Sequence, residues 1–374
     1  MSAPLNIAMA GGGTGGHVIP ALAVARELQL RGHSPFFVGT RHGLEAKLVS
    51  DAEFPIEWID IGGLKGLGAR KQLRTLWQLP PSVVYAWRLL RRRHAAAIFS
   101  MGGYVAGPVM LAAWLARIPI VIMEPNAMPG FTSRSMGRLV ARALVSFPES
   151  APYFRRGRTE LTGLPVREAF LRIPPSPCGD IFTVLVTGGS QGSRTLNRAV
   201  AESWPLFRDA RFPIRFLHQT GPGPQPEIAG FPGTIVPFID DMPAAFAAAD
   251  LVVCRSGAGA VAELAAAGKP AILVPFPFAA DQHQLRNAEA FARAGAARLV
   301  PDAGMNGRRL FEEIVALASD AGSLQRMGQA ARSLAHAGAA ARAAEILEEV
   351  ATGPRPVAGS SFPLTSNDKA ETIR

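Results

Sequence analysis

The sequence predicts an α/β protein with two tandem Rossmann-like domains that face each other across a deep cleft. Its 374 residues exceed the size at which a single hydrophobic core stops growing, so two domains are expected. Short apolar runs alternate with helical patterns, which is typical of an open, mostly parallel sheet. After residues 172–180, the same order of strand, glycine loop and helix begins again.

The first half of the chain contains strand-like runs separated by helical patterns. We expect strands at 6–10, 35–38, 56–61, 97–100, 118–123 and 143–146. The stretch 95–123 is so apolar that hydropathy alone would suggest a membrane span. Its breaks at Gly102-Gly103, Gly107-Pro108 and Pro119 favour instead a buried strand, a helix and a second buried strand.

The second half repeats this layout. Residues 182–200 repeat the opening strand, glycine turn and helix, and residues 251–276 repeat the stretch around 97–124. We therefore expect a first domain over 1–165, a second over 166–339, and ligands at the carboxyl ends of both sheets. The helix near 340–350 is expected to pack back on the first domain. Residues 352–374 are expected to form a disordered tail.

Charge and cysteine content narrow the class of partner. The net charge of +10 favours nucleic acid, phospholipid headgroups or a phosphorylated substrate. No acidic residue lies between Asp60 and Glu124, so one surface of the first domain should carry the excess. Cys178 and Cys254 are far apart, which fits a reducing cytoplasm and argues against a zinc site. The N-terminus lacks the pattern of a secretory signal.

The opening stretch "AGGGTGGHVIPALAVA" has the layout of a phosphate cradle, in which backbone N–H groups gather at a helix N-terminus. Its GxGxxG spacing also matches the dinucleotide fingerprint. The second strand ends in Gly39-Thr40-Arg41 with no acidic residue, which disfavours NAD and leaves an NADP interpretation through Arg41. No Lys-Ser/Thr pair follows, which excludes a P-loop NTPase. His17 is either a capping or packing histidine or a general base.

Polar residues in the second half are candidates for nucleotide-sugar binding. The turn Ser190-Gln191-Gly192 could cap a helix or hold a phosphate. Glu263 is either a solvated surface residue or a carboxylate that accepts both hydroxyls of a ribose. Gln284 and Asn287 are three residues apart, hence on one helical face, which suits them to sugar hydroxyls.

The segment 65–93 interleaves apolar and basic residues. It fits a solvated basic helix, a peripheral membrane patch on anionic lipid, or an RNA-binding surface. The RNA interpretation lacks stacking platforms and a known motif. The residues of the predicted membrane patch are Leu73, Leu76, Trp77, Trp87, Arg88, Arg91, Arg92 and Arg93.

Six motifs in this order resemble those of one family. They are "GGGTGGHVIPALAVA", "MGGYVAGP", "TGGSQGSRTLN", "FIDDM", "CRSGAGAVAELAAAGKPAILVPFP" and "DQHQLRNA". Over residues 5–345 the chain resembles the peptidoglycan N-acetylglucosaminyltransferases of glycosyltransferase family 28. The resemblance implies a B-type glycosyltransferase fold, UDP-GlcNAc as donor, lipid I as acceptor, and lipid II and UDP as products. It also implies a peripheral enzyme on the cytoplasmic face of the plasma (inner) membrane.

The resemblance also implies roles for single residues in the first half. Thr14, Gly15 and Gly16 would contact the donor, and His17 would stand nearest the acceptor hydroxyl. Further residues implied to line the site are Asn126, Arg167 and Ser190. No metal or other cofactor is expected, because helix N-termini and Arg167 can stabilise the leaving diphosphate.

In the second half, the resemblance implies that Ile239 meets uracil through its backbone, Glu263 the ribose hydroxyls and Gln284 the donor sugar. The chain departs from the family pattern at four positions. These are Met123, Pro125, Leu164 and Ala260. Met123 and Pro125 affect the contacts expected around Asn126. Ala260 replaces a threonine whose hydroxyl would bond the diphosphate, and Leu164 replaces an asparagine before Pro165.

Alternatives from other classes remain open at this stage. One is a related UDP-sugar enzyme, such as a UDP-GlcNAc 2-epimerase or a glycosyltransferase with another lipid acceptor. Others are a non-catalytic sugar-nucleotide-binding protein and a basic RNA- or membrane-binding module. The expected partners are UDP-GlcNAc, lipid I, an anionic membrane surface and other cell-wall synthesis or division proteins, without nucleic acid.

Overall fold

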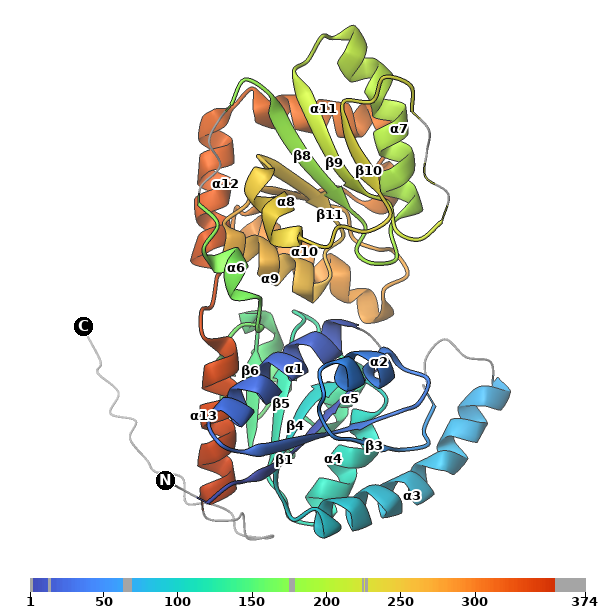
Figure 1. Cartoon of the computed structure of the whole chain (residues 1–374), viewed down its shortest axis with the longest axis vertical. Coiled ribbons are helices and arrows are strands. Elements are labelled where there is room, and N and C mark those ends of the chain that lie inside the picture. Colours follow the sequence, from blue (N-terminus) through green and yellow to red (C-terminus); the bar gives the residue numbers. More distant parts are fainter. Residues whose placement is uncertain are drawn as a thin grey trace, which may run out of the picture.

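The computed structural model describes residues 3–12, 15–62, 69–174, 179–223, 225 and 228–353, with the side chains of 69–76 left out. Two α/β domains lie one above the other along the long axis of the molecule (Figure 1). The first holds a seven-stranded sheet and the second a six-stranded sheet. This arrangement confirms the predicted fold class of two Rossmann-like domains.

The first domain contains most of the N-terminal half. Its elements are β1 (Asn6–Gly11), α1 (Gly15–Leu30), β2 (Ser34–Gly39), α2 (Leu44–Asp51), β3 (Ile56–Trp58), α3 (Ala69–Arg92), β4 (Ala95–Gly102), α4 (Ala106–Leu115), β5 (Ile120–Glu124), α5 (Phe131–Met136), β6 (Arg142–Val145), η1 (Pro148–Tyr153) and β7 (Thr159–Leu161).

The second domain follows after a short connection. Its elements are α6 (Glu168–Leu171), β8 (Phe182–Thr187), α7 (Arg194–Asp209), β9 (Ile214–Gln219), β10 (Gly233–Val236), α8 (Met242–Ala248), β11 (Leu251–Cys254), α9 (Ala258–Ala267), β12 (Ala271–Leu273), η2 (Ala280–Gln282), α10 (His283–Arg293), β13 (Ala297–Leu299), η3 (Asp302–Gly304), α11 (Gly307–Ala318) and α12 (Ala321–Ser333). The last helix, α13 (Ala339–Thr352), returns to the first domain.

Both sheets are parallel and wound in the same way. The first runs β3-β2-β1-β4-β5-β6-β7 and the second β10-β9-β8-β11-β12-β13. The strand order reverses between β1 and β4 and again between β8 and β11. Loops at such a reversal open a crevice at the carboxyl ends of the strands, where ligands bind in α/β proteins. In this chain, these four loops are rich in glycine.

The strands are buried on both faces, which explains their continuous apolar sequences. In the first domain, Ala8 and Ile98 face the core beneath α3 and α4. Ile7 and Phe99 face the opposite core, which α1 covers together with Leu347 of α13. Helix α13 therefore completes the core of the domain with which the chain began (Figure 1).

A polar contact fixes α13 at its far end. The buried His33 imidazole accepts the Leu5 N–H at Nδ1, 3.2 Å away, so in its neutral form the proton is on Nε2. Nε2 then donates to the Glu348 carboxylate at 2.8 Å. Arg31 reaches the same carboxylate at 3.3 Å. These contacts join the end of α1 to α13.

The expected strands are present with shifted ends. The strand expected at 56–61 ends at Trp58, and the one expected at 118–123 begins after Pro119 at Ile120. The edge strand β7 was not predicted, because its three residues form no apolar run. Helix α13 extends to Thr352, and the rest of the expected tail, from 354, lies outside the described residues, as does Cys178. In the described part, no helix is both long and apolar enough to cross a membrane.

Candidate active site

The first glycine loop holds His17 in the first turn of α1. The His17 Nδ1 atom lies 3.2 Å from the Gly12 carbonyl oxygen, which can only accept a hydrogen bond. The neutral imidazole therefore carries its proton on Nδ1 and has its lone pair on Nε2. Gly103 has φ +83, and a Cβ there would lie 3.0 Å from the Gly12 oxygen and 3.4 Å from His17 Nδ1. Only glycine fits this close approach.

Burial lowers the pKa of His17 below its ordinary value. The hydrogen bond to Gly12 and the Glu45 carboxylate oppose this shift, and the nearby His283 of the second domain adds to it. At neutral pH, His17 is therefore uncharged and able to accept a proton at Nε2. Gly15 and Gly16 lie in the same helical turn, and Thr14 lies outside the described residues.

A buried carboxylate orders the loop that contains Asn126. Glu124 accepts the Asn126 N–H at 3.1 Å, the Asn126 side-chain amide at 3.2 Å and the Gly130 N–H at 3.2 Å. Burial raises the pKa of Glu124 although these hydrogen bonds oppose the shift. Pro125 has no N–H to contribute, and Met123 is buried in the core.

The Asn126 loop is joined directly to the second domain by Asn287. The Asn287 amide donates to Asn126 Oδ1 and to the Ser256 carbonyl, both at 3.1 Å, and accepts the Ala127 N–H at 2.9 Å. Its side chain is fully buried. Both of its amide hydrogens are therefore engaged between the domains, while its expected role toward a sugar hydroxyl stays a prediction.

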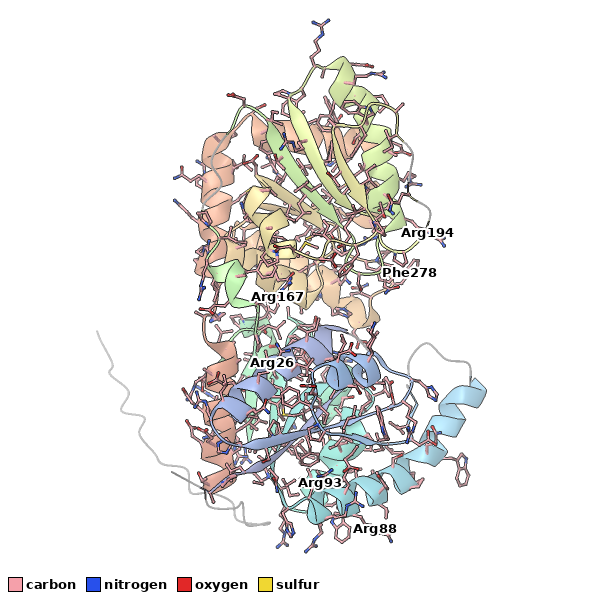
Figure 2. The ribbon with its side chains drawn as sticks, in the orientation of Figure 1. Arg26, Arg88, Arg93, Arg167, Arg194 and Phe278 are labelled. Carbon is pink, nitrogen blue, oxygen red and sulfur yellow. The ribbon has the colours of Figure 1, made fainter. Side chains whose placement is uncertain are left out.

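Ion pairs flank this contact. Arg134 of α5 meets Asp281 at 3.0 Å, and Glu149 of η1 meets Arg293 at 2.6 Å. The carboxyl ends of the two sheets thus face each other across one interface. In Figure 2, Arg167 and Phe278 lie at the end of the second domain that is nearer the first.

The glycine loop after β8 presents Ser190 and Gln191 to solvent. The helix cap that we considered for Ser190 is instead provided by Ser193, which accepts the Leu196 N–H at 3.3 Å. Gly192 has φ +71 and packs so closely on the Thr220 carbonyl that no side chain fits there. Ser190 is exposed in the loop that precedes the N-terminus of α7, and an anion would be stabilised at that helix end.

Gln219, the last residue of β9, holds this loop in place and was not predicted from the sequence. Its buried amide donates to Thr187 Oγ1 at 3.1 Å and to the Gly189 carbonyl at 2.9 Å, and it accepts the Ile239 N–H at 2.9 Å. The Ile239 N–H is therefore already engaged, which leaves the Ile239 carbonyl for a base. A buried polar residue at the end of β9, "HQTG", was the available signal.

Glu263 lies on α9 and faces the connection between the domains. Its carboxylate is 3.7 Å from the Arg167 guanidinium, which also lies over the Phe170 ring at 5.0 Å. Burial raises the pKa of Glu263 to about 7, although Arg167 opposes the shift. Ala260 lies one turn earlier on the same helix and Leu164 is buried in the first-domain core, so neither departure supplies a polar group.

Gln284 is anchored at the start of α10. Its side-chain oxygen accepts the Phe276 N–H at 3.0 Å, and its carbonyl accepts the Ser256 hydroxyl at 2.8 Å. Among the described residues, none accepts a hydrogen bond from its side-chain amide nitrogen. Among the described residues, no group of three or more His, Cys, Asp or Glu side chains could hold a metal ion.

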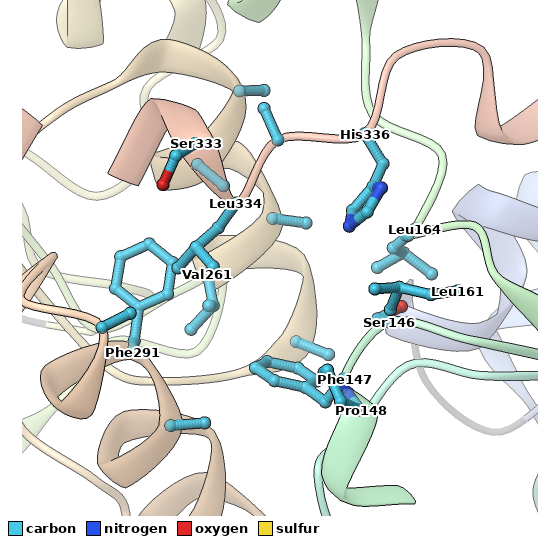
Figure 3. Close-up of a pocket in the computed structure, with 18 of the residues that line it drawn as sticks. Ser146, Phe147, Pro148, Leu161, Leu164, Val261, Phe291, Ser333, Leu334 and His336 are labelled. Carbon is cyan, nitrogen blue, oxygen red and sulfur yellow. The ribbon is translucent and has the colours of Figure 1, made fainter. Parts of the chain in front are cut away.

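An apolar cavity of about 400 Å³ lies between the two domains, beside the segments that connect them (Figure 3). Phe147 and Leu164 of the first domain line it together with Val261 and Phe291 of the second. His336, which leads into α13, closes one end. None of the residues predicted to contact donor or acceptor lines this cavity, so it is separate from the candidate active site.

The predicted membrane patch is partly exposed and partly internal. Trp77 is 77% exposed, and Arg88 projects at the end of the first domain remote from the second (Figure 2). Trp87 packs on the core beneath α3, with Arg91 stacked on its ring at 5.0 Å. Arg92 and Arg93 form ion pairs with Glu57, at 3.5 and 2.5 Å. The side chains of Leu73 and Leu76 lie outside the described residues.

Two parallel α/β domains whose glycine-rich loops lie at the carboxyl ends of both sheets form the B-type glycosyltransferase fold. The chain belongs to glycosyltransferase family 28. Residues 7–145 match the N-terminal domain of this family and residues 183–348 match its C-terminal domain.

Individual relatives are similar over nearly the whole chain. The "UDP-N-acetylglucosamine--N-acetylmuramyl-(pentapeptide) pyrophosphoryl-undecaprenol N-acetylglucosamine transferase" of Solibacter usitatus is 62% identical over 92% of this chain and 95% of its own. The protein of the same name from Nitrosococcus oceani is 45% identical, over 93% and 99%. A crystal structure of MurG from Acinetobacter baumannii superimposes with a TM-score of 0.79 at 32% identity, covering 92% of this chain and 100% of that one.

Proposed function

We propose that the chain transfers GlcNAc from UDP-GlcNAc to lipid I, the undecaprenyl-pyrophosphoryl-MurNAc-pentapeptide, and releases UDP. The product is lipid II, a precursor of peptidoglycan. The relatives that carry this activity in their name are similar over more than nine tenths of the chain. The observation that supports the chemistry best is the contact between His17 Nδ1 and the Gly12 carbonyl, because it places the proton on Nδ1 and makes Nε2 the basic nitrogen.

The reaction is an inverting displacement. The C4 hydroxyl oxygen of the acceptor MurNAc attacks the anomeric carbon of the α-linked donor, and its proton passes to His17 Nε2. The bond from the anomeric carbon to the diphosphate oxygen breaks, and UDP leaves with the electron pair. The N-terminus of α7 and the Arg167 guanidinium stabilise the charge that develops on the diphosphate.

The donor is held mainly by the second domain. Glu263 accepts the two ribose hydroxyls, and the Ile239 carbonyl accepts the uracil N–H. The amide nitrogen of Gln284 binds a hydroxyl of the sugar. The two glycine loops also contact the donor, through Thr14, Gly15 and Gly16 in the first domain and through Ser190 and Gln191 in the second. Asn126 and Asn287 are the remaining residues that we assign to substrate binding.

We assign the enzyme a peripheral position on the cytoplasmic face of the plasma (inner) membrane. The support is the exposed apolar and basic surface of α3, on which Trp77 and Arg88 project. Anionic headgroups would attract this surface. Other cell-wall synthesis or division proteins are further proposed partners.

Release of UDP from UDP-GlcNAc, measured with and without lipid I, tests the proposal. We expect release that depends on lipid I. A 2-epimerase would convert the donor sugar without lipid I, and a sugar-nucleotide-binding protein would bind the donor without release. A transferase for another lipid would ignore lipid I, and an RNA- or membrane-binding module would not bind UDP-GlcNAc. Any of these four results would contradict the proposal.

A further inference from the structure

Glu45 is a buried carboxylate beneath the opening glycine loop. Glu45 is the second residue of α2 and is only 1% exposed. Its Oε1 atom accepts the N–H of Thr40 at 3.0 Å and the hydroxyl of Thr40 at 2.8 Å. Burial of an ionisable group is costly unless its partners compensate for the lost water, so its position calls for a reason.

Three glycines make room for this carboxylate. A Cβ at Gly12 would lie 2.7 Å from the carboxyl carbon of Glu45, and a Cβ at Gly39 would lie 2.7 Å from its Cγ. Gly43 approaches the same carboxylate even more closely. The ends of β1 and β2 and the start of α2 therefore pack on Glu45. Gly12 also holds His17, so a single residue separates the carboxylate from the candidate base.

A hydrogen-bonded relay connects Glu45 to the second glycine loop of the first domain. The Thr40 hydroxyl donates its only proton to Glu45, so its contact with the Tyr104 hydroxyl, 3.1 Å away, is donated by Tyr104. Tyr104 follows Gly103, which packs on both Gly12 and His17. Glu45 thus joins the two loops between which His17 lies.

We propose that Glu45 is a positioning residue for the transfer reaction. Through Thr40, Tyr104 and its packing on Gly12, it fixes the loops 11–12 and 102–104 and thereby the place of His17 Nε2 relative to the acceptor hydroxyl. This inference rests on the proposed function, because it concerns the base of that reaction. Glu45 does not touch either substrate in this account.

Glu45→Gln in the full-length chain is the direct test, because it keeps the shape of the side chain and removes its charge. We expect kcat to fall about 10- to 100-fold, since a small displacement of a reacting group has an effect of this order. The KM for UDP-GlcNAc should change less than about twofold, because the donor-binding residues lie mainly in the second domain.

The pH dependence of kcat distinguishes positioning of His17 from a general structural role. Among the described residues, the titratable groups that act on His17 electrostatically include Glu45 on α2 and His283 on α10. The Glu45 charge favours the protonated imidazole, so its removal lowers the pKa of His17. The acidic limb of the kcat profile should therefore move to lower pH in Glu45→Gln. Loosening of the fold would instead admit water to the imidazole and move the limb to higher pH, because burial is what lowers the pKa of His17.

Matched variants keep the test independent of folding. Asp51→Asn, at the exposed end of the same helix, should leave kcat and its pH profile unchanged. Tyr104→Phe removes one hydroxyl and should lower kcat without raising the KM for UDP-GlcNAc, which provides the test if Glu45→Gln does not fold. Combined with Glu45→Gln, it should lower kcat less than the product of the two single effects.

The inference is overturned if Glu45→Gln and Tyr104→Phe retain the kcat and the acidic limb of the unaltered chain while His17→Ala is inactive. If His17→Ala is itself fully active, the proposed base is wrong and the inference fails with it. Lipid I-dependent UDP release by the unaltered chain, measured in the same series, shows whether the proposed function stands independently of Glu45.

Discussion

His17 and Glu263 both have shifted pKa values, and they should act on different kinetic constants. His17 lies in the first domain and is held by the Gly12 carbonyl, whereas Glu263 lies on α9 beside Arg167. Burial lowers the pKa of the first and raises that of the second to about 7. Acid conditions therefore remove both functions, the base at the lower pH and the ribose contact at the higher.

Replacing His17 by Ala should lower kcat by about 100-fold or more, because a positioned general base contributes on this order. The affinity for UDP-GlcNAc should stay the same, since His17 serves the acceptor hydroxyl. Steady-state kinetics with lipid I, together with calorimetric binding of UDP-GlcNAc, measure both quantities. If kcat falls by less than tenfold while the affinity for UDP-GlcNAc is unchanged, His17 is not the base.

Donor binding should depend on pH through Glu263. Below pH 7 its carboxyl is protonated and loses one acceptor for the ribose hydroxyls, so the KM for UDP-GlcNAc should rise as the pH falls through about 7. Glu263→Gln should show a raised KM that no longer varies over this range. If Glu263→Gln changes only kcat, the ribose contact is wrongly assigned.

Candidate residues that follow a local motif could be named from the sequence, and their roles stay predictions, whereas residues that act through packing could not be named. His17, Ser190 and Glu263 each follow a strand-glycine-helix start that the sequence displays directly. Gln219 and Glu45 act through contacts with segments from other strands, and no spacing in the chain encodes those contacts.

At the scale of elements, α3 was predicted as an amphipathic, basic segment, and its packing reduces the predicted patch. Trp87 faces the core and two arginines of the run pair with Glu57, because β3 ends beside the C-terminus of α3. Helix α4, which packs against α3, adds the exposed Trp114 and Leu115. The periodicity identified the helix, but the identity of its buried face required the neighbouring strand and helix.

The double variant Trp77→Ala, Arg88→Ala should bind anionic vesicles more weakly. Each basic residue near such a surface contributes about 1 kcal/mol, so the Arg88 change alone should reduce partitioning about fivefold. Sedimentation with phosphatidylglycerol vesicles measures the effect, which added salt should diminish. Arg308→Ala, on an exposed helix of the second domain, is the control. Equal partitioning of the double variant and the unaltered chain would rule out this surface as the membrane contact.

At the scale of the whole molecule, the presence of two similar parallel α/β domains followed from the internal repeat, because each half shows the same sequence of strand, glycine loop and helix. The contacts between the domains did not follow, since they join residues about 160 positions apart, such as Asn126 and Asn287. The apolar cavity between Phe147 and Phe291 likewise depends on how the two domains meet.

Asn287→Ala should destabilise the chain more than Arg293→Ala. The first change leaves the buried Ala127 N–H without its acceptor, at a cost of about 1–3 kcal/mol. The second breaks an ion pair whose arginine is 66% exposed, and such pairs contribute less than about 1 kcal/mol. Denaturant unfolding followed by circular dichroism compares the two. A larger loss of stability for Arg293→Ala would contradict this account of the interface.

The central claim is that the chain forms a β-1,4 bond between GlcNAc and the MurNAc of lipid I. Incubation of the purified chain with radiolabelled UDP-GlcNAc and lipid I, followed by extraction and NMR of the lipid product, tests it most directly. The account predicts that the label enters the lipid fraction and that the new glycosidic linkage is β at C4 of MurNAc. Label that stays with the nucleotide, or a product with an α linkage, would contradict it.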